Sequence, residues 1–211
     1  PIAIMVAGFF TFTLVRYLRE QKKSREIRQA FEHYVPADVV GQLVLDPSQI
    51  KLGGDRKHIT VMFTDLAGFT SLAENTEAEE LSSILNDHLN RMTKIILRNG
   101  GTLDKFIGDA ILIFFGDPET EGTALDAEKC VNMAIAMRKR VGELDEVWKK
   151  EKGITQGLQV RTGISTGYCT VGNFGSVQRV DYTVLGSPVN LAARLEAACG
   201  PQEILVSPET K

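Results

Sequence analysis

The sequence predicts an α+β domain built on a ferredoxin-like split βαβ sheet that helices cover on one face. The first observation behind this prediction is the order of apolar patterns, which runs strand, helix, hairpin, helix and strand along residues 59–165. The second is that two apolar runs, at 59–64 and 110–115, each meet an aspartate at one end. A buried strand tolerates a charge only where it reaches a cleft or water, so these two ends indicate a candidate site.

The segment ahead of this domain is different in character. Residues 1–15 are apolar or small and carry no charge, but a bilayer takes about 20 residues to cross. Because the chain opens on Pro1 rather than Met, we expect a fragment that begins within the last part of a transmembrane helix. A signal-peptide core or a buried helix is the alternative. Six basic and two acidic side chains follow between residues 16 and 28, a flank typical of the cytoplasmic side of a membrane.

Residues 16–46 are expected to form cytoplasmic connector helices, and residues 47–211 the main domain. The connector helix, from residue 17 to about 35, has a narrow apolar seam. An exposed helix with so narrow a seam would gain most by pairing with a second copy of itself, and a solvated connector is the alternative. Pro36 ends this helix, and a short helix over 38–45 closes at Asp46 and Pro47.

Charge and cysteine content exclude some classes of function. From residue 31 onward the chain has 18 basic and 25 acidic side chains, which disfavours a nucleic-acid polymer but allows a small nucleotide held with metal. The three cysteines are widely spaced among apolar neighbours, so they are expected to be reduced core thiols in a cytosolic domain.

The two aspartates at strand ends are Asp65 and Asp109. Carboxylates on neighbouring strands offer the hard oxygen ligands that Mg²⁺ prefers, with substrate phosphates completing its coordination. The turn after Asp65 contains Gly68, Phe69 and Thr70, whose backbone N–H groups would face those phosphates. Considered alone, Asp109 and nearby Lys105 would form a surface turn with a weak ion pair.

Two long helices flank the hairpin. The first follows a capping box at Thr76 to Glu79, carries apolar residues at helical spacing and stops at Asn99, before two glycines. The second is expected from about residue 124 to 149, with Cys130, Met133 and other apolar residues on one face.

The part after Gly153 is rich in strands, expected at 157–165, 168–172 and 180–185. Arg161 lies in the first of these and needs an anion, which either a phosphate or a structural carboxylate would supply. A last helix is expected to begin at Ser187, and its Asn190 and Arg194 are one turn apart on one face. Taken alone, they would be a cap partner and a solvated charge.

Together these segments resemble the catalytic domain of the class III nucleotidyl cyclases, from about residue 55 to 211. Three motifs carry the resemblance: FTDLAGFT at 63–70, KFIGD at 105–109 and GSPVNLAAR at 186–194. The resemblance implies the class III cyclase fold and the conversion of a nucleoside triphosphate to a cyclic nucleotide and pyrophosphate.

The resemblance also implies a role for each matching residue. Two Mg²⁺ or Mn²⁺ ions would be bound by Asp65 and Asp109. Arg194 would stabilise the transition state and Asn190 would position the ribose, while Arg161 matches a position that contacts the outer phosphates. Lys105 and Thr183 resemble the base-selecting pair of adenylate cyclases, which implies ATP as substrate. Guanylate cyclases typically have glutamate and cysteine there.

In this family the metal-binding and the other site residues come from different subunits, so the resemblance implies a homodimer with composite sites. It further implies a bacterial membrane-bound protein with an upstream sensor domain and a cytoplasmic catalytic domain that produces a second messenger. A family lysine that contacts phosphate comes later than Lys211, so truncation is expected at this end also. The alternatives are a guanylate cyclase, a diguanylate cyclase on a related sheet, or a non-catalytic nucleotide-binding dimerisation module.

Overall fold

The computed structural model describes residues 9, 12–22, 52–152, 154, 157–176 and 178–211. The chain divides into two units, residues 1–50 and 51–211, and each is described by itself. In the first unit residues 12–22 are helical and exposed, and the Gln21 amide donates to the Tyr17 hydroxyl (2.6 Å). No helix within the described ranges is long and apolar enough to cross a membrane. Most of 1–15, and residues 23–46 of the connector predicted at 16–46, lie outside the described residues.

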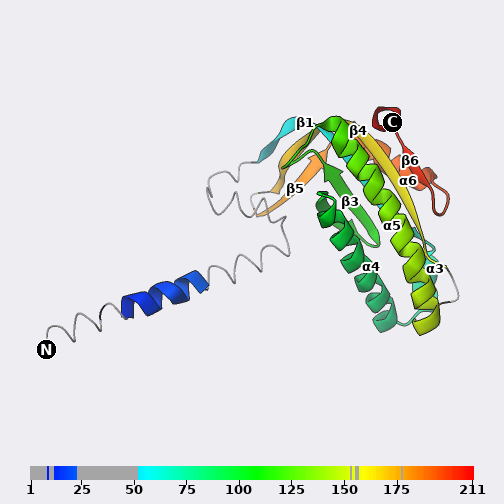
Figure 1. The fold of residues 1–211 in the computed structure, drawn as a ribbon, viewed down its shortest axis with the longest axis horizontal. Coiled ribbons are helices and arrows are strands. Elements are labelled where there is room, and N and C mark those ends of the chain that lie inside the picture. The colour runs from blue at the N-terminus through cyan, green and yellow to red at the C-terminus, as the bar shows by residue number, and fades with distance from the viewer. Residues whose placement is uncertain (1–8, 10–11, 23–51, 153, 155–156, 177) are drawn as a thin grey trace. The chain divides into compact units, whose positions relative to one another are not determined.

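The second unit is organised around two long antiparallel strands, β1 (Gly53–Ala67) and β4 (Gln159–Ser176). They pair along their whole shared length, from Gly53 opposite Asn173 to Ala67 opposite Gln159. The sheet order is β2-β3-β1-β4-β5, with β2 at Thr102–Ile107, β3 at Ala110–Phe115 and β5 at Arg179–Leu185. The short β6 (Ile204–Val206) runs parallel to β4 (Figure 1). A 3-10 turn at Pro208–Thr210 follows it.

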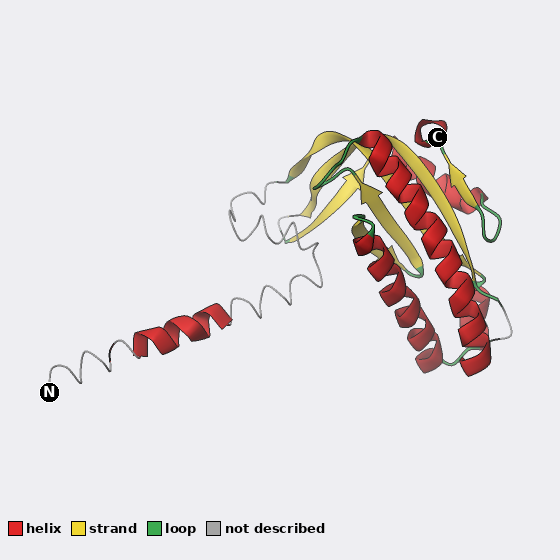
Figure 2. Cartoon of the chain, viewed as in Figure 1, coloured by secondary structure: helices red, strands yellow, loops and turns green. Residues whose placement is uncertain are grey.

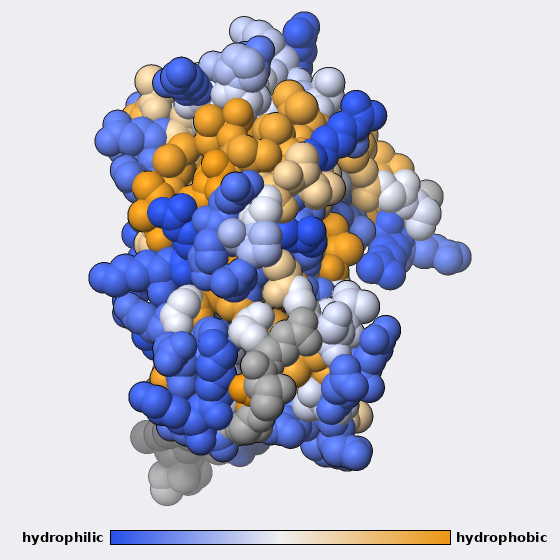
Figure 3. Space-filling model, turned by 90° about the vertical axis from the view of Figure 1, so that its right-hand side faces the viewer, coloured by the Kyte–Doolittle hydropathy of each residue, from blue (hydrophilic) through white to orange (hydrophobic). Residues whose placement is uncertain are grey.

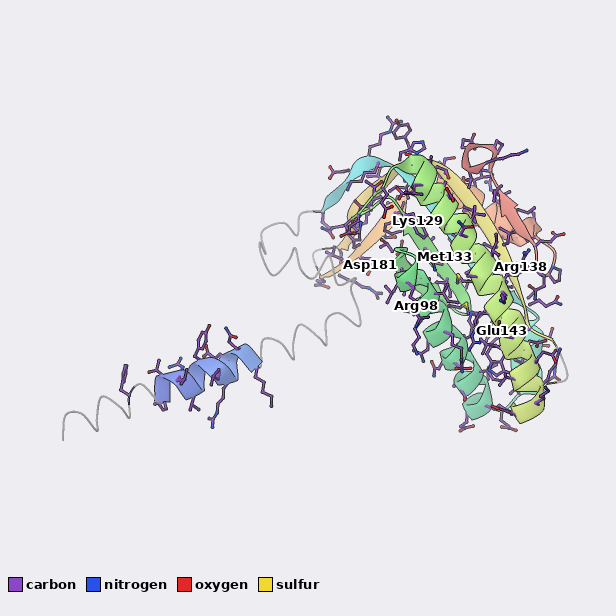
Figure 4. All side chains as sticks on the ribbon, viewed as in Figure 1. Arg98, Lys129, Met133, Arg138, Glu143 and Asp181 are labelled. Atoms are coloured by element: carbon purple, nitrogen blue, oxygen red, sulfur yellow. The ribbon has the colours of Figure 1, made fainter. Side chains whose placement is uncertain are left out.

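Helices α4 (Ala78–Arg98) and α5 (Thr123–Lys152) cover one face of this sheet, as Figure 2 shows. On that face Ile111 and Ile113 of β3 share one hydrophobic core with Met133 of α5, which is completely buried. Glu143, on the same helix, is exposed (Figure 4). The expected ferredoxin-like arrangement is therefore confirmed for this face.

The opposite face of the sheet holds a second, smaller core. Leu112 and Phe114 of β3 point there, so β3 is buried on both faces as predicted. Helix α6 (Ser187–Ala198) packs on this face through the fully buried Ala192. A Cβ on Gly163 of β4 would lie 2.1 Å from the Ala192 carbonyl oxygen, so α6 lies directly against the strand backbone. Another helix, α3 (Phe69–Asn75), follows β1.

The sheet is strongly curled. Strands β2 and β5 lie at opposite ends of the strand order, yet the Thr183 hydroxyl of β5 donates to the Asp104 carboxylate of β2. A second link joins the same regions, because the buried Asp117 after β3 accepts from the Tyr182 hydroxyl and from Lys57. The curl therefore brings the two edges of the sheet together.

Several predicted boundaries need correction. The strand predicted at 59–64 extends to 53–67, and those at 157–165 and 168–172 are one strand, because pairing with β1 is continuous. The predicted capping box is wrong: α4 begins at Ala78 after Glu77, and no side chain caps it. Ser187 lies inside α6 rather than at its N-cap, which is Gly186.

Apolar surface remains between hydrophilic side chains on the face shown in Figure 3.

Candidate active site

The two predicted metal ligands, Asp65 and Asp109, lie together. Asp65 is near the end of β1, and Asp109 is in the β2–β3 turn, where Gly108 has the positive φ (66°) that favours glycine. The Asp109 Oδ2 accepts from the backbone N–H of Leu66 (3.3 Å), the residue after Asp65. Burial, and then the neighbouring Asp65 carboxyl, raise the pKa of Asp109 to about 6.

Arg161 lies directly opposite Asp65 in the β1–β4 pairing. Its guanidinium donates to Asp65 Oδ2 and lies 3.2 Å from the Glu196 carboxylate of α6. The sequence left open whether a phosphate or a structural carboxylate would pair with Arg161, and in the structure the carboxylates of Asp65 and Glu196 do so. Sequence reasoning missed Glu196. Its spacing of four residues from the buried Ala192 was the available signal, because residues i and i+4 share one helix face.

Lys105 and Thr183, the predicted base-selecting pair, are brought together by Asp104. Thr183 is buried and donates to Asp104 Oδ2 (2.5 Å), and the Lys105 ammonium lies 3.4 Å from Asp104 Oδ1. Asp104 was not among the predicted site residues. No local pattern could identify it, because its partner is 79 residues away in sequence.

Asn190 and Arg194 are both exposed on α6. Neither side chain forms a hydrogen bond or ion pair with any other residue in the described part of the chain. They are therefore available to a ligand or to another molecule. In the turn predicted to face phosphates, Gly68 has φ 93° and precedes α3, and Phe69 and Thr70 belong to the first turn of this helix. First-turn N–H groups lack partners within their helix.

The site has the ligand chemistry for a divalent cation only in part. Among the described residues no group of three or more His, Cys, Asp and Glu side chains is arranged to hold a metal. Asp65 and Asp109 offer two hard carboxylate groups side by side, and burial, followed by the Asp65 carboxyl, raises the pKa of Asp109. This donor set fits Mg²⁺ or Mn²⁺ if the phosphates of a bound nucleotide provide further oxygens.

The curled sheet therefore carries a pair of adjacent carboxylates, Asp65 and Asp109, and an exposed amide and guanidinium, Asn190 and Arg194, which have the chemistry to bind a cation and an anion. The family model described as the adenylate and guanylate cyclase catalytic domain matches residues 54–211. The chain therefore belongs to this family, the class III nucleotidyl cyclases.

Two solved structures and a curated relative agree with this membership. The adenylyl cyclase CyaB from P. aeruginosa is 54% identical, with a TM-score of 0.74, and the match covers 75% of this chain and 81% of that one. The guanylyl cyclase Cya2 is 38% identical, with a TM-score of 0.70, over 75% of this chain and 79% of that one. An adenylate cyclase from Anabaena cylindrica is 34% identical over 180 residues, which is 82% of this chain. The chain spans about a third of the length of the curated relatives it matches.

Proposed function

We propose that this chain is the catalytic part of an adenylate cyclase that converts ATP to 3′,5′-cyclic AMP and pyrophosphate for intracellular signalling. The observation that carries the proposal is the pair of adjacent carboxylates, Asp65 and Asp109, beside the turn at residues 66–70. The choice of ATP is supported by Lys105 and Thr183 and by the 54% identity with an adenylyl cyclase.

In this proposal Asp65 and Asp109 hold two Mg²⁺ or Mn²⁺ ions. When bound, the cations would lower the pKa of the ribose 3′-hydroxyl and neutralise charge on the triphosphate. Arg161 would exchange its contact with Asp65 for the outer phosphates, since a guanidinium binds either anion through the same donors. The turn containing Gly68, Phe69 and Thr70 would offer backbone donors to the phosphates.

The remaining residues act on the reacting atoms. The ribose 3′-oxygen forms a bond with the α-phosphorus, the bond to the pyrophosphate oxygen breaks in line, and the hydroxyl proton is released. Arg194 stabilises negative charge on the α-phosphoryl group, and Asn190 holds the ribose so that attack is in line. Both side chains are exposed and lack protein partners in the described residues, as such roles require.

We further propose a symmetric homodimer in which Asn190 and Arg194 complete the site of the partner's Asp65 and Asp109. A twofold arrangement makes two equivalent composite sites. Mixing Asp65→Ala chains with Asn190→Ala chains tests this, because each heterodimer then contains one intact site. Recovery of cyclic AMP synthesis from two inactive variants supports the shared site, and its absence rejects it.

A guanylate cyclase is the second candidate, favoured by the 38% identity with Cya2. Turnover of ATP and GTP by the purified chain with Mn²⁺ separates the two, and preference for GTP would overturn the assignment of Lys105 and Thr183. Turnover of neither nucleotide, with binding retained, would favour a non-catalytic dimerisation module.

The location of the protein is a separate proposal. The basic flank at residues 16–28 supports a cell-membrane protein anchored through an N-terminal helix, with its catalytic domain in the cytoplasm and an upstream sensor. Fractionation of cells that express the full-length protein tests this. Recovery in the soluble fraction would reject the anchor.

A further inference from the structure

Asp104 is a buried carboxylate that contacts both members of the proposed base-selecting pair. Its side chain has no exposed surface. Oδ2 accepts from the Thr183 hydroxyl (2.5 Å) and the Val184 backbone N–H (3.4 Å). Oδ1 lies 3.4 Å from the Lys105 ammonium but accepts no hydrogen bond within the described ranges. A buried carboxylate needs such partners, because burial alone strongly disfavours its charged form.

The backbone explains why Asp104 and Lys105, neighbours in one strand, meet at the same place. Successive side chains of a regular strand point to opposite faces. Between Leu103 and Lys105, however, the β2–β3 register shifts, so that Leu103 faces Ile113 while Lys105 faces Leu112. Asp104 is the extra residue of this irregularity, and such bulges re-aim side chains. The curl of the sheet then brings Thr183 to the same carboxylate.

We propose that Asp104 is a specificity-determining positioning residue, which fixes Thr183 as a hydrogen-bond acceptor and Lys105 as a donor toward the nucleotide base. The proposal rests on the cyclase function proposed above and deepens it. A hydroxyl has one hydrogen and can either donate or accept. Because Asp104 takes the hydrogen of Thr183, only the oxygen lone pairs of that hydroxyl remain for a ligand.

This polarity matches one purine and opposes the other. Adenine presents an amino group, a donor, at its 6-position and an acceptor at N1, so it complements an accepting Thr183 and a donating Lys105. Guanine presents a carbonyl oxygen and an N1–H at these positions, so its acceptor would face the accepting Thr183 and its donor would face the donating Lys105. Without Asp104 the Thr183 hydroxyl would turn and donate to the guanine oxygen. The carboxylate therefore acts against GTP as much as for ATP.

The test is Asp104→Asn, because the amide has the same shape but offers Thr183 a donor as well as an acceptor. We expect the ratio of kcat/KM for ATP to that for GTP to fall about tenfold, since site polarity alone discriminates by at least this much. Asp117→Asn is the matched control. It alters another buried carboxylate that accepts from a β5 hydroxyl, that of Tyr182, and should leave the ratio unchanged. An unchanged ratio in Asp104→Asn overturns the proposal.

A double substitution separates action through Thr183 from general damage. Thr183→Val removes the hydroxyl, so adding Asp104→Asn should lower the ATP/GTP ratio by clearly less than it does in the unmodified chain, the remainder acting through Lys105. A further drop of the same size would show that Asp104 does not act through Thr183. If the unmodified chain turns over neither nucleotide, or prefers GTP, the proposed function itself fails. If it prefers ATP while Asp104→Asn keeps that preference, only the present inference fails.

A measurement on the unmodified chain covers the case in which Asp104→Asn does not fold. Burial raises the pKa of Asp104, against the donors Thr183 and Val184 and the charge of Lys105 that face it. Once protonated, Asp104 can itself donate to the Thr183 oxygen and so free the hydrogen of that hydroxyl for the base, which should make the ATP/GTP ratio fall as the pH is lowered through that pKa. Effects on the shared phosphate and metal groups cancel in the ratio. A ratio that stays constant over the whole acidic range in which the protein remains folded would overturn the proposal.

Discussion

Replacing Asp109 by asparagine is expected to stabilise the metal-free protein while abolishing its activity. The Asp109 carboxyl is held beside Asp65, and its pKa rises from 3.8 to about 6. A rise of this size corresponds to about 3 kcal/mol against the ionised form at neutral pH. Because Asp109 is only half-buried, solvent screening reduces the expected gain to about 1 to 2 kcal/mol. In a domain of this size that is about 3 to 6 °C in Tm.

The pH dependence has a definite sign. Asp109 has a folded-state pKa above its unfolded value, so its ionisation costs stability above pH 6, and this cost disappears as the pH falls toward 3.8. The advantage of Asp109→Asn should therefore be largest at pH 7 to 8 and shrink through pH 6.

Thermal unfolding with chelator and with Mn²⁺ measures both effects. Added Mn²⁺ should raise the Tm of the unmodified chain by mass action, and that of Asp109→Asn much less. Asp181→Asn is the matched control, since this exposed carboxylate on β5 (Figure 4) has, among the residues that the structure describes, only the distant Arg179 (3.8 Å) as a partner. A lower Tm for Asp109→Asn at pH 7.5 without metal, or equal stabilisation of both proteins by Mn²⁺, would refute the reasoning.

Four further substitutions test the packing and the site. Gly163→Ala should lower the free energy of unfolding by about 2 to 3 kcal/mol and reduce turnover, because its Cβ would meet the α6 backbone at 2.1 Å. Gly142→Ala is the control: its Cβ would have no neighbour within 4 Å, so it should raise the free energy of unfolding by about 0.5 to 1 kcal/mol in the same denaturant titration. Arg161→Ala should lower the free energy of unfolding at pH 7, measured with chelator, by about 1 to 2 kcal/mol, because it leaves Asp65 and Glu196 without the guanidinium they share. Equal stability of the two proteins would show that these ion pairs contribute nothing. Arg194→Ala should change Tm within error, yet reduce cyclic AMP synthesis by about 100-fold or more, and retained activity would remove Arg194 from the transition state.

What could be predicted from the sequence was local. Apolar periodicity identified the strands, the long helices and their order, because burial of one face imposes that pattern residue by residue. The same reasoning placed Asp65 and Asp109 together, since both strand ends are readable and β1 and β3 are neighbours. The helical spacing of Asn190 and Arg194 was equally local, and α6 presents both to the outside.

The tertiary structure alone decided which distant groups meet. Nothing near Arg161 in the sequence indicates that it lies between Asp65 and Glu196, because the contact depends on pairing β1 with β4 and laying α6 across them. The partnership of Asp104 with Thr183 depends on a register shift in β2 and on the curl that joins opposite sheet edges. These features arise from the twist of the whole sheet, a collective property that no short stretch of residues contains.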